Sequence, residues 1–152
     1  FPFERLATFD AEAWQRMRAV QSQRIPAHHC YGSDRDAAAI AMSQANAERA
    51  GVAAWTEFRQ CPVSEIVPPP GPPGLVITSP PYGARLGDKQ KLSALYHALG
   101  QTLKTRFAGW RAGILTSEPT LAYATGLPFL PTTAPVPHGG LRISLFRTAA
   151  LG

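Results

Sequence analysis

The order of helix-like and strand-like patterns constrains this fold more than any other feature of the sequence. Short apolar stretches with β-sheet character alternate with helical patterns from Asp10 to Gly126. Such alternation is typical of a mostly parallel α/β sheet whose right-handed crossovers bring the strand ends to one edge. Two β-like stretches joined near His138-Gly139-Gly140 then predict an antiparallel hairpin at the end of the chain.

Helix caps and periodicity place the individual elements. Asp10 can cap a first helix, and the alanine-rich segment 35–51 predicts a second one, which Gly51 ends. Segments 28–34, 52–60, 75–78 and 112–117 predict strands, and 75–78 is expected to be a compact, buried one. Segment 118–126 predicts a short helix. One further helical stripe is expected to pack on the sheet, and it consists of Leu92, Leu95, Tyr96, Leu99, Leu103 and Phe107.

Composition limits the class of protein. The 152 residues fit one domain, and 45% hydrophobic against 16% charged residues argues against a disordered tail. No apolar run approaches the ~20 residues that span a bilayer, and no export signal is visible. We therefore expect a cytoplasmic protein with no membrane contact. The sequence starts without Met, and we expect it to be part of a longer protein. Cys30 and Cys61 are too few for a disulfide scaffold.

An acidic residue stands at the tip of the first predicted strand, in the sequence YGSDRD. In nucleotide-binding sheets a carboxylate at this place accepts hydrogen bonds from both ribose hydroxyls of an adenosine. Asp34 is positioned for that contact, and Arg35 could lie along an adenine edge. The alternative is a helix cap, which Ser33, Asp34 or Asp36 could provide.

The sequence SPPY, Ser79–Tyr82, directly follows the predicted strand 75–78 and is the sharpest candidate site. The exocyclic amine of a nucleobase is a poor nucleophile because its lone pair is delocalised into the ring. Two acceptors that hold its hydrogens draw the nitrogen toward tetrahedral geometry, and the Ser79 hydroxyl and the Pro80 carbonyl are suitable. Pro80 and Pro81 stiffen the backbone, and Tyr82 offers a flat face for a base turned out of its stack. The alternative is a proline-rich turn with a packing tyrosine.

Other chemistry finds little support. His28, His29 and Cys30 alternate across a strand instead of converging, so we predict no metal site. Ser117 and Glu118 follow a strand, but no partner histidine is implied by spacing.

The net charge of +5 permits a polyanion partner and equally fits an ordinary basic protein. Three basic residues follow SPPY closely, Arg85, Lys89 and Lys91. They could hold phosphates beside a bound base or form a solvated loop.

With these motifs, the chain resembles the RNA methylase family, S-adenosylmethionine-dependent enzymes that methylate the exocyclic N2 amine of guanine in ribosomal or transfer RNA. The matching segments are YGSDRDAAAIAMSQANAERAGV, GLVITSPPYGARLGD, LTSEPTLAYATGL and GGLRISLFR. They cover most of residues 31–147, and PPYGARLG is the most specific. A terminal hairpin on a mostly parallel sheet also fits the Rossmann-like, class I methyltransferase fold.

The resemblance implies roles for particular residues. Those implied to bind the methyl donor are Ser33, Asp34, Arg35, Gln60, Cys61 and Ser79. Those implied to hold the target amine and base are Ser79, Pro80, Pro81 and Tyr82. Ser79 stands where the family usually has Asn, and serine here is more typical of enzymes that methylate cytosine amines in DNA. Pro62 replaces an acid that often touches the adenine.

The family's first strand and its glycine-rich loop have no counterpart in this sequence. In the family fold that strand lies between the strands predicted near His29 and Val76, and the loop holds the methionine half of the donor. We therefore expect residues 1–152 to form a methyltransferase catalytic domain that lacks the first strand and the loop.

The resemblance implies an RNA partner, S-adenosylmethionine as the methyl donor without a metal, and a THUMP-type RNA-binding domain outside this chain. Two alternatives stay open. A DNA amino-methyltransferase is favoured by Ser79, and a degenerate, non-catalytic RNA-binding module is favoured by the missing loop and by Pro62.

Overall fold

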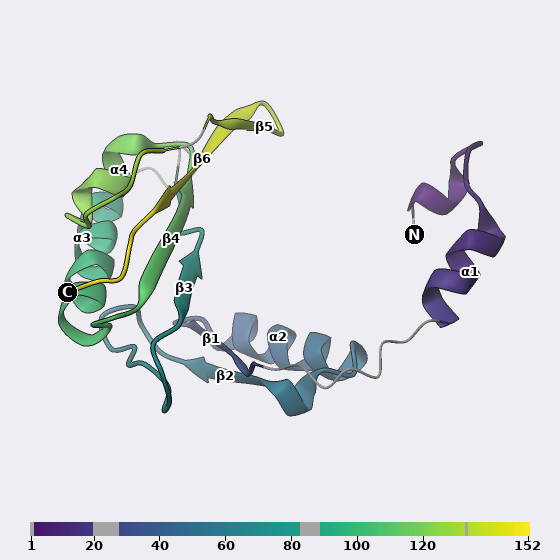
Figure 1. The fold of residues 1–152 in the computed structure, drawn as a ribbon, viewed down its shortest axis with the longest axis horizontal. Helices are drawn as coiled ribbons and strands as arrows, with labels where there is room; N and C mark the ends of the chain where they lie inside the picture. The colour runs from purple at the N-terminus through teal and green to yellow at the C-terminus, as the bar shows by residue number, and fades with distance from the viewer. Residues whose placement is uncertain (1, 20–27, 83–88, 133) are drawn as a thin grey trace.

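The computed structural model describes residues 2–19, 28–82, 89–132 and 134–152. Helices and strands alternate along the chain as expected (Figure 1). In order they are η1 (Pro2–Arg5), α1 (Ala11–Ala19), β1 (Cys30–Asp34), α2 (Ala37–Arg49), η2 (Ala53–Trp55), β2 (Thr56–Gln60), β3 (Leu75–Thr78), α3 (Lys89–Arg106), β4 (Arg111–Thr116), α4 (Pro119–Ala124), β5 (Val136–His138) and β6 (Leu141–Arg147).

The strands form two hydrogen-bonded sheets instead of the single expected one. β1 pairs in parallel with β2, and a four-stranded sheet has the order β3-β4-β6-β5. β3 and β4 are parallel, whereas β6 is antiparallel to both β4 and β5. The terminal hairpin is thus confirmed, with Gly139 and Gly140 at φ of +54° and +81° in its turn. Among the described residues no strand lies between β1 and β3, and each of these two strands has one hydrogen-bonded neighbour.

The main core lies between α3 and the four-stranded sheet. The predicted helical stripe is confirmed, since four of its residues are almost fully buried: Tyr96, Leu99, Leu103 and Phe107. They share one cluster with Ala112 and Ile114 of β4 and with Phe146 of β6. α4 packs closely on α3, because a Cβ added at Gly100 would come within 1.9 Å of the Thr125 carbonyl oxygen.

The smaller sheet is covered by α2, which buries Ile40 and Ala47. This helix begins after the cap residue Asp36, whose Oδ1 accepts the Ala38 amide at 2.8 Å. As expected, Gly51 follows its end with a φ of +68°.

Two expectations about the strands are wrong. β3 is not buried, since Leu75 and Ile77 are 55% and 61% exposed. Side chains alternate along a strand, so Val76 faces the core while these two face the side over which no described element packs. In addition, the first part of the predicted strand 52–60 forms the short helix η2 instead.

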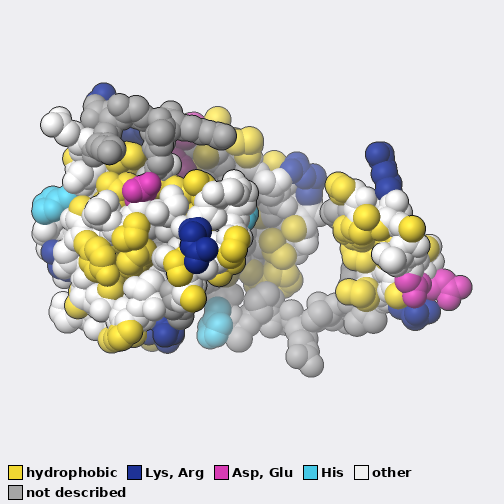
Figure 2. Space-filling model, turned by 90° about the horizontal axis from the view of Figure 1, so that it is seen from above, with side chains coloured by type: hydrophobic (Ala, Val, Ile, Leu, Met, Phe, Trp, Pro, Cys, Tyr) yellow, Lys and Arg dark blue, Asp and Glu magenta, His cyan; other side chains and the backbone are white. Residues whose placement is uncertain are grey.

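The N-terminal segment lies apart from both sheets (Figure 1). α1 forms as predicted, but none of its residues is buried. Figure 2 shows hydrophobic side chains on the surface of this segment, at the right of the view. No helix in the described part of the chain has the length and apolar character needed to cross a bilayer.

Candidate active site

The Ser79–Tyr82 segment leaves the carboxyl end of β3 at the surface. Ser79 and Pro81 are exposed, and Pro80 and Tyr82 are half-buried. The Ser79–Tyr82 segment is therefore accessible to a ligand. Of the three basic residues expected to follow it, Arg85 and the side chain of Lys89 lie outside the described part, and Lys91 is exposed.

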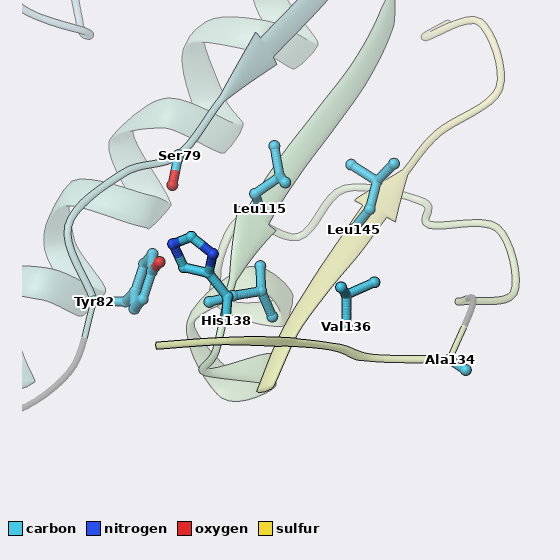
Figure 3. Close-up of a pocket in the computed structure, with 8 residues that line it drawn as sticks. Ser79, Tyr82, Leu115, Ala134, Val136, His138 and Leu145 are labelled. Carbon is cyan, nitrogen blue, oxygen red and sulfur yellow. The ribbon is translucent and has the colours of Figure 1, made fainter. Parts of the chain in front are cut away.

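A hollow of about 380 Å³ opens beside this segment, and most of its lining is aliphatic. Its walls come from the end of β3, from β4 and from the terminal hairpin (Figure 3). The lining residues are Ser79, Tyr82, Leu115, Ala134, Val136, His138, Ile143 and Leu145. A hollow with apolar walls and a few polar groups suits a flat heterocycle that needs orienting.

The polar groups of the hollow gather at one end. In Figure 3 the imidazole of His138 points toward the Tyr82 ring and the Ser79 hydroxyl. A ring lying in the hollow can therefore meet a hydroxyl, a phenol and an imidazole on one side and aliphatic side chains on the other.

The Pro80 carbonyl, the second proposed acceptor, has a protein partner. The Tyr96 hydroxyl of α3 donates to it at 3.4 Å. Burial raises the pKa of Tyr96, because the charged phenolate would lose its hydration there. A carbonyl oxygen has two lone pairs, so this bond leaves one for a ligand.

The residues expected to bind adenosine meet at the carboxyl ends of β1 and β2. Asp34 and Gln60 are paired in the register of the two strands. The Cys61 amide donates to the Asp34 carbonyl at 2.8 Å, and the Gln60 side-chain amide donates to the Arg35 carbonyl at 3.1 Å. Ser33 is one residue upstream and exposed. Two strand ends thus present one continuous polar edge.

The carboxylate of Asp34 does not cap α2, because Asp36 takes that role. One Asp34 oxygen, Oδ1, accepts the Asp36 amide at 2.9 Å, which holds the side chain in place. Asp34 is exposed, and a carboxylate offers about four acceptor positions. It therefore keeps the capacity to accept ribose hydroxyls.

The two groups of candidate residues lie on different sheets. The lining of the hollow includes Ser79 and Tyr82, but neither Pro80 nor Pro81 and none of the residues expected to bind adenosine at the ends of β1 and β2. In Figure 1, β1 and β2 run crosswise to β3. Among the described residues, no three His, Cys, Asp or Glu side chains are grouped so that they could hold a metal ion.

Two residues of the site had no role assigned from the sequence. His138 was placed only at the hairpin turn, and Tyr96 only in the apolar stripe. The one available signal was the hydroxyl of Tyr96, since a buried tyrosine needs a hydrogen-bond partner.

Solved structures share this architecture. The chain superposes over its full length on 40% of a possible methylase from Clostridium difficile 630, with a TM-score of 0.77 and 28% identity. It likewise covers 40% of SMU.472, whose crystal structure is a complex with SAH, with a TM-score of 0.75 and 22% identity. The chain therefore has the Rossmann-like fold of class I methyltransferases, and the predicted fold class is confirmed.

Sequence comparison identifies the family. The model of the RMKL-like methyltransferase domain matches residues 3–128, and the chain belongs to this family, which confirms the resemblance. The ribosomal RNA large subunit methyltransferase K/L of Chromohalobacter salexigens is 38% identical over an alignment of 135 residues, and the alignment covers 84% of this chain. The same alignment covers 18% of that relative, so the chain spans less than a fifth of its length.

Proposed function

We propose that the complete protein transfers a methyl group from S-adenosylmethionine to the exocyclic N2 amine of a guanine in ribosomal RNA. Residues 1–152 would form part of its catalytic domain. Membership of the RMKL-like methyltransferase family supports the reaction class, and the name of the Chromohalobacter relative supports the choice of ribosomal RNA.

One observation carries the proposal. The Ser79 hydroxyl and the Tyr82 ring line the same hollow, at the carboxyl end of a strand, where α/β sheets bind their ligands. A guanine in this hollow can lie against Tyr82 while its amine points to Ser79. Base–aromatic stacking of this kind is worth ~1–3 kcal/mol.

The residues on β1 and β2 fit the adenosine half of the donor. The Asp34 carboxylate would accept the ribose hydroxyls, and Gln60 and Cys61 would border the adenine. The donor supplies an electrophilic methyl group on a sulfonium. The Asp36 amide holds one oxygen of the Asp34 carboxylate, Oδ1. The second oxygen, Oδ2, can accept hydrogen bonds from the ribose hydroxyls.

The chain's own contribution to the reaction is alignment. Ser79 Oγ and the Pro80 carbonyl accept the two amine hydrogens, which draws the nitrogen lone pair out of the ring system. Pro80 and Pro81 hold these acceptors with few free torsions, so little entropy is lost when the base binds. The N–CH3 bond forms as the sulfonium–methyl bond breaks, and the surplus proton of the cationic amine is released to solvent water.

The sheet edges support the proposal that the catalytic domain has a further strand. β1 and β3 each carry one hydrogen-bonded neighbour among the described residues. Open edges expose a row of unpaired backbone groups, and one strand between β1 and β3 would satisfy both. It would also turn β1 alongside β3 and bring Asp34 toward Ser79. We further propose a THUMP-type RNA-binding domain elsewhere in the protein and a cytoplasmic location.

A methylation assay with labelled S-adenosylmethionine tests the function. The complete protein is incubated separately with ribosomal RNA and with duplex DNA, and the products are digested to nucleosides. We expect label in N2-methylguanosine from RNA. Label in a DNA amine would instead support the DNA methyltransferase that Ser79 favours. RNA binding without donor binding in calorimetry would support a non-catalytic module.

A further inference from the structure

The buried Tyr96 hydroxyl of α3 contacts the Ser79–Tyr82 segment from the core side. Tyr96 has no exposed surface, and its hydroxyl donates to the Pro80 carbonyl at 3.4 Å. The typical O–H···O distance is about 2.7–2.8 Å, so this is a long bond. Such a bond contributes little energy, and its main effect is to orient the Pro80 carbonyl.

A second hydroxyl, from β4, lies next to that of Tyr96. Thr116 is fully buried at the end of β4, and its side chain lowers the pKa of Tyr96 against the larger, opposite effect of burial, which places it beside the Tyr96 hydroxyl. Thr116 Oγ1 in turn accepts the Glu118 amide at 3.0 Å. The Glu118 amide, the Thr116 and Tyr96 hydroxyls and the Pro80 carbonyl thus follow one another from the end of β4 to the segment after β3. We call these groups the Tyr96 relay.

The relay acts on the one torsion that the prolines leave open. The ring of Pro80 fixes its φ, and the ring of Pro81 fixes the next φ. The direction of the Pro80 carbonyl then depends on the ψ of Pro80, which precedes a proline and still spans about 40° of preferred range. A donor at a fixed place in the core selects one direction within that range.

We propose that Tyr96 is a positioning residue for methyl transfer, which aims the Pro80 carbonyl at the target amine and is itself held by Thr116. This rests on the proposed function, in which that carbonyl accepts an amine hydrogen. The relay joins the segments that follow two neighbouring parallel strands, β3 and β4. The site geometry is therefore set by the core of the domain.

Burial keeps the relay in its donating form. It raises the pKa of Tyr96, and the nearby Tyr82 and Glu118 also disfavour a phenolate. The hydroxyl therefore remains protonated and available to the Pro80 carbonyl at neutral pH.

Substitutions that remove single hydroxyls test the relay in the complete protein. Tyr96→Phe keeps the ring in the core and removes the donor. We expect kcat on ribosomal RNA to fall about 3- to 10-fold, the range for one modest hydrogen bond. The RNA KM and the donor Kd should stay within about twofold, since only the reacting geometry changes. Thr116→Val should lower kcat in the same direction, and Thr116→Ser, which keeps a hydroxyl, should lower it less.

The matched control is Tyr123→Phe, which removes a hydroxyl from a tyrosine that is 61% exposed on α4. It should leave kcat unchanged. A double variant, Tyr96→Phe with Thr116→Val, should be no slower than Tyr96→Phe alone, because both act on one carbonyl. Tyr96→Phe with a lower melting temperature but an unchanged kcat would overturn the proposal and leave Tyr96 a core residue.

A second readout does not depend on activity. The carbon-13 resonance of the Pro80 carbonyl should move upfield in Tyr96→Phe and stay in place in Tyr123→Phe. If the wild-type protein methylates no RNA, the proposed function fails. The carbonyl resonance then decides alone whether the Tyr96 hydroxyl holds Pro80, and an unmoved resonance overturns the relay.

Discussion

The ring of Tyr82 gives the sharpest single test of how the site binds its base. Tyr82→Ala removes the half-buried ring that lines the hollow next to Ser79. Stacking of a base on an aromatic ring is worth ~1–3 kcal/mol, which corresponds to a loss of about 5- to 150-fold. We expect this loss in kcat/KM for ribosomal RNA.

Donor affinity should change little, because the candidate adenosine-binding residues lie on β1 and β2 and do not line the hollow. The assay combines steady-state methylation of ribosomal RNA with calorimetry of S-adenosylmethionine binding. Both use the complete protein. Tyr82→Phe keeps the stacking face and is the control, with an expected loss of less than about threefold.

Two results would refute this assignment. Equal losses in RNA methylation and in donor affinity would mean that Tyr82 does not act on the base alone. A Tyr82→Phe variant as slow as Tyr82→Ala would mean that the phenol oxygen matters and the ring face does not.

Three further predictions concern other parts of the chain. Asp34→Ala should weaken donor binding about 10- to 100-fold in calorimetry, the range for hydrogen bonds to a charged group, and unchanged affinity would contradict its role. Gly100→Ala should reduce the free energy of unfolding by about 1–3 kcal/mol and so lower the melting temperature, because its Cβ would meet the Thr125 carbonyl oxygen at 1.9 Å. Gly113→Ala is its control, with no neighbour closer than 3.5 Å, and equal shifts would refute the argument. His138→Ala should slow RNA methylation and spare donor affinity, and a fully active variant would exclude a substrate contact.

Local patterns predicted most of the fold because they report local physics. The stripe through Tyr96, Leu99 and Leu103 marks one face of a helix, whatever that face packs against. The glycines at 139 and 140 indicate a tight hairpin because both adopt positive φ. The prediction that β3 is buried was wrong, because an apolar strand sequence does not reveal whether a layer covers each of its faces.

The site was predictable only in part, for the same reason. The Ser79–Tyr82 segment could be singled out because its residue types and its place after a strand carry the chemistry. The hollow beside this segment could not be predicted. Its opposite wall comes from residues 134–145 and depends on the register that pairs Leu115 with Leu145. Helical periodicity likewise placed Tyr96 in the core without indicating that its hydroxyl meets Pro80.

The most direct measurement is a crystal structure of the complete protein with SAH and a ribosomal RNA fragment that contains the target guanine. The account predicts that the guanine N2 lies within hydrogen-bond distance, about 2.7–3.2 Å, of both Ser79 Oγ and the Pro80 carbonyl oxygen. The base should rest on the Tyr82 ring, with Asp34 at the ribose of SAH. A guanine bound elsewhere, or one whose amine faces away from Ser79 and Pro80, would contradict it.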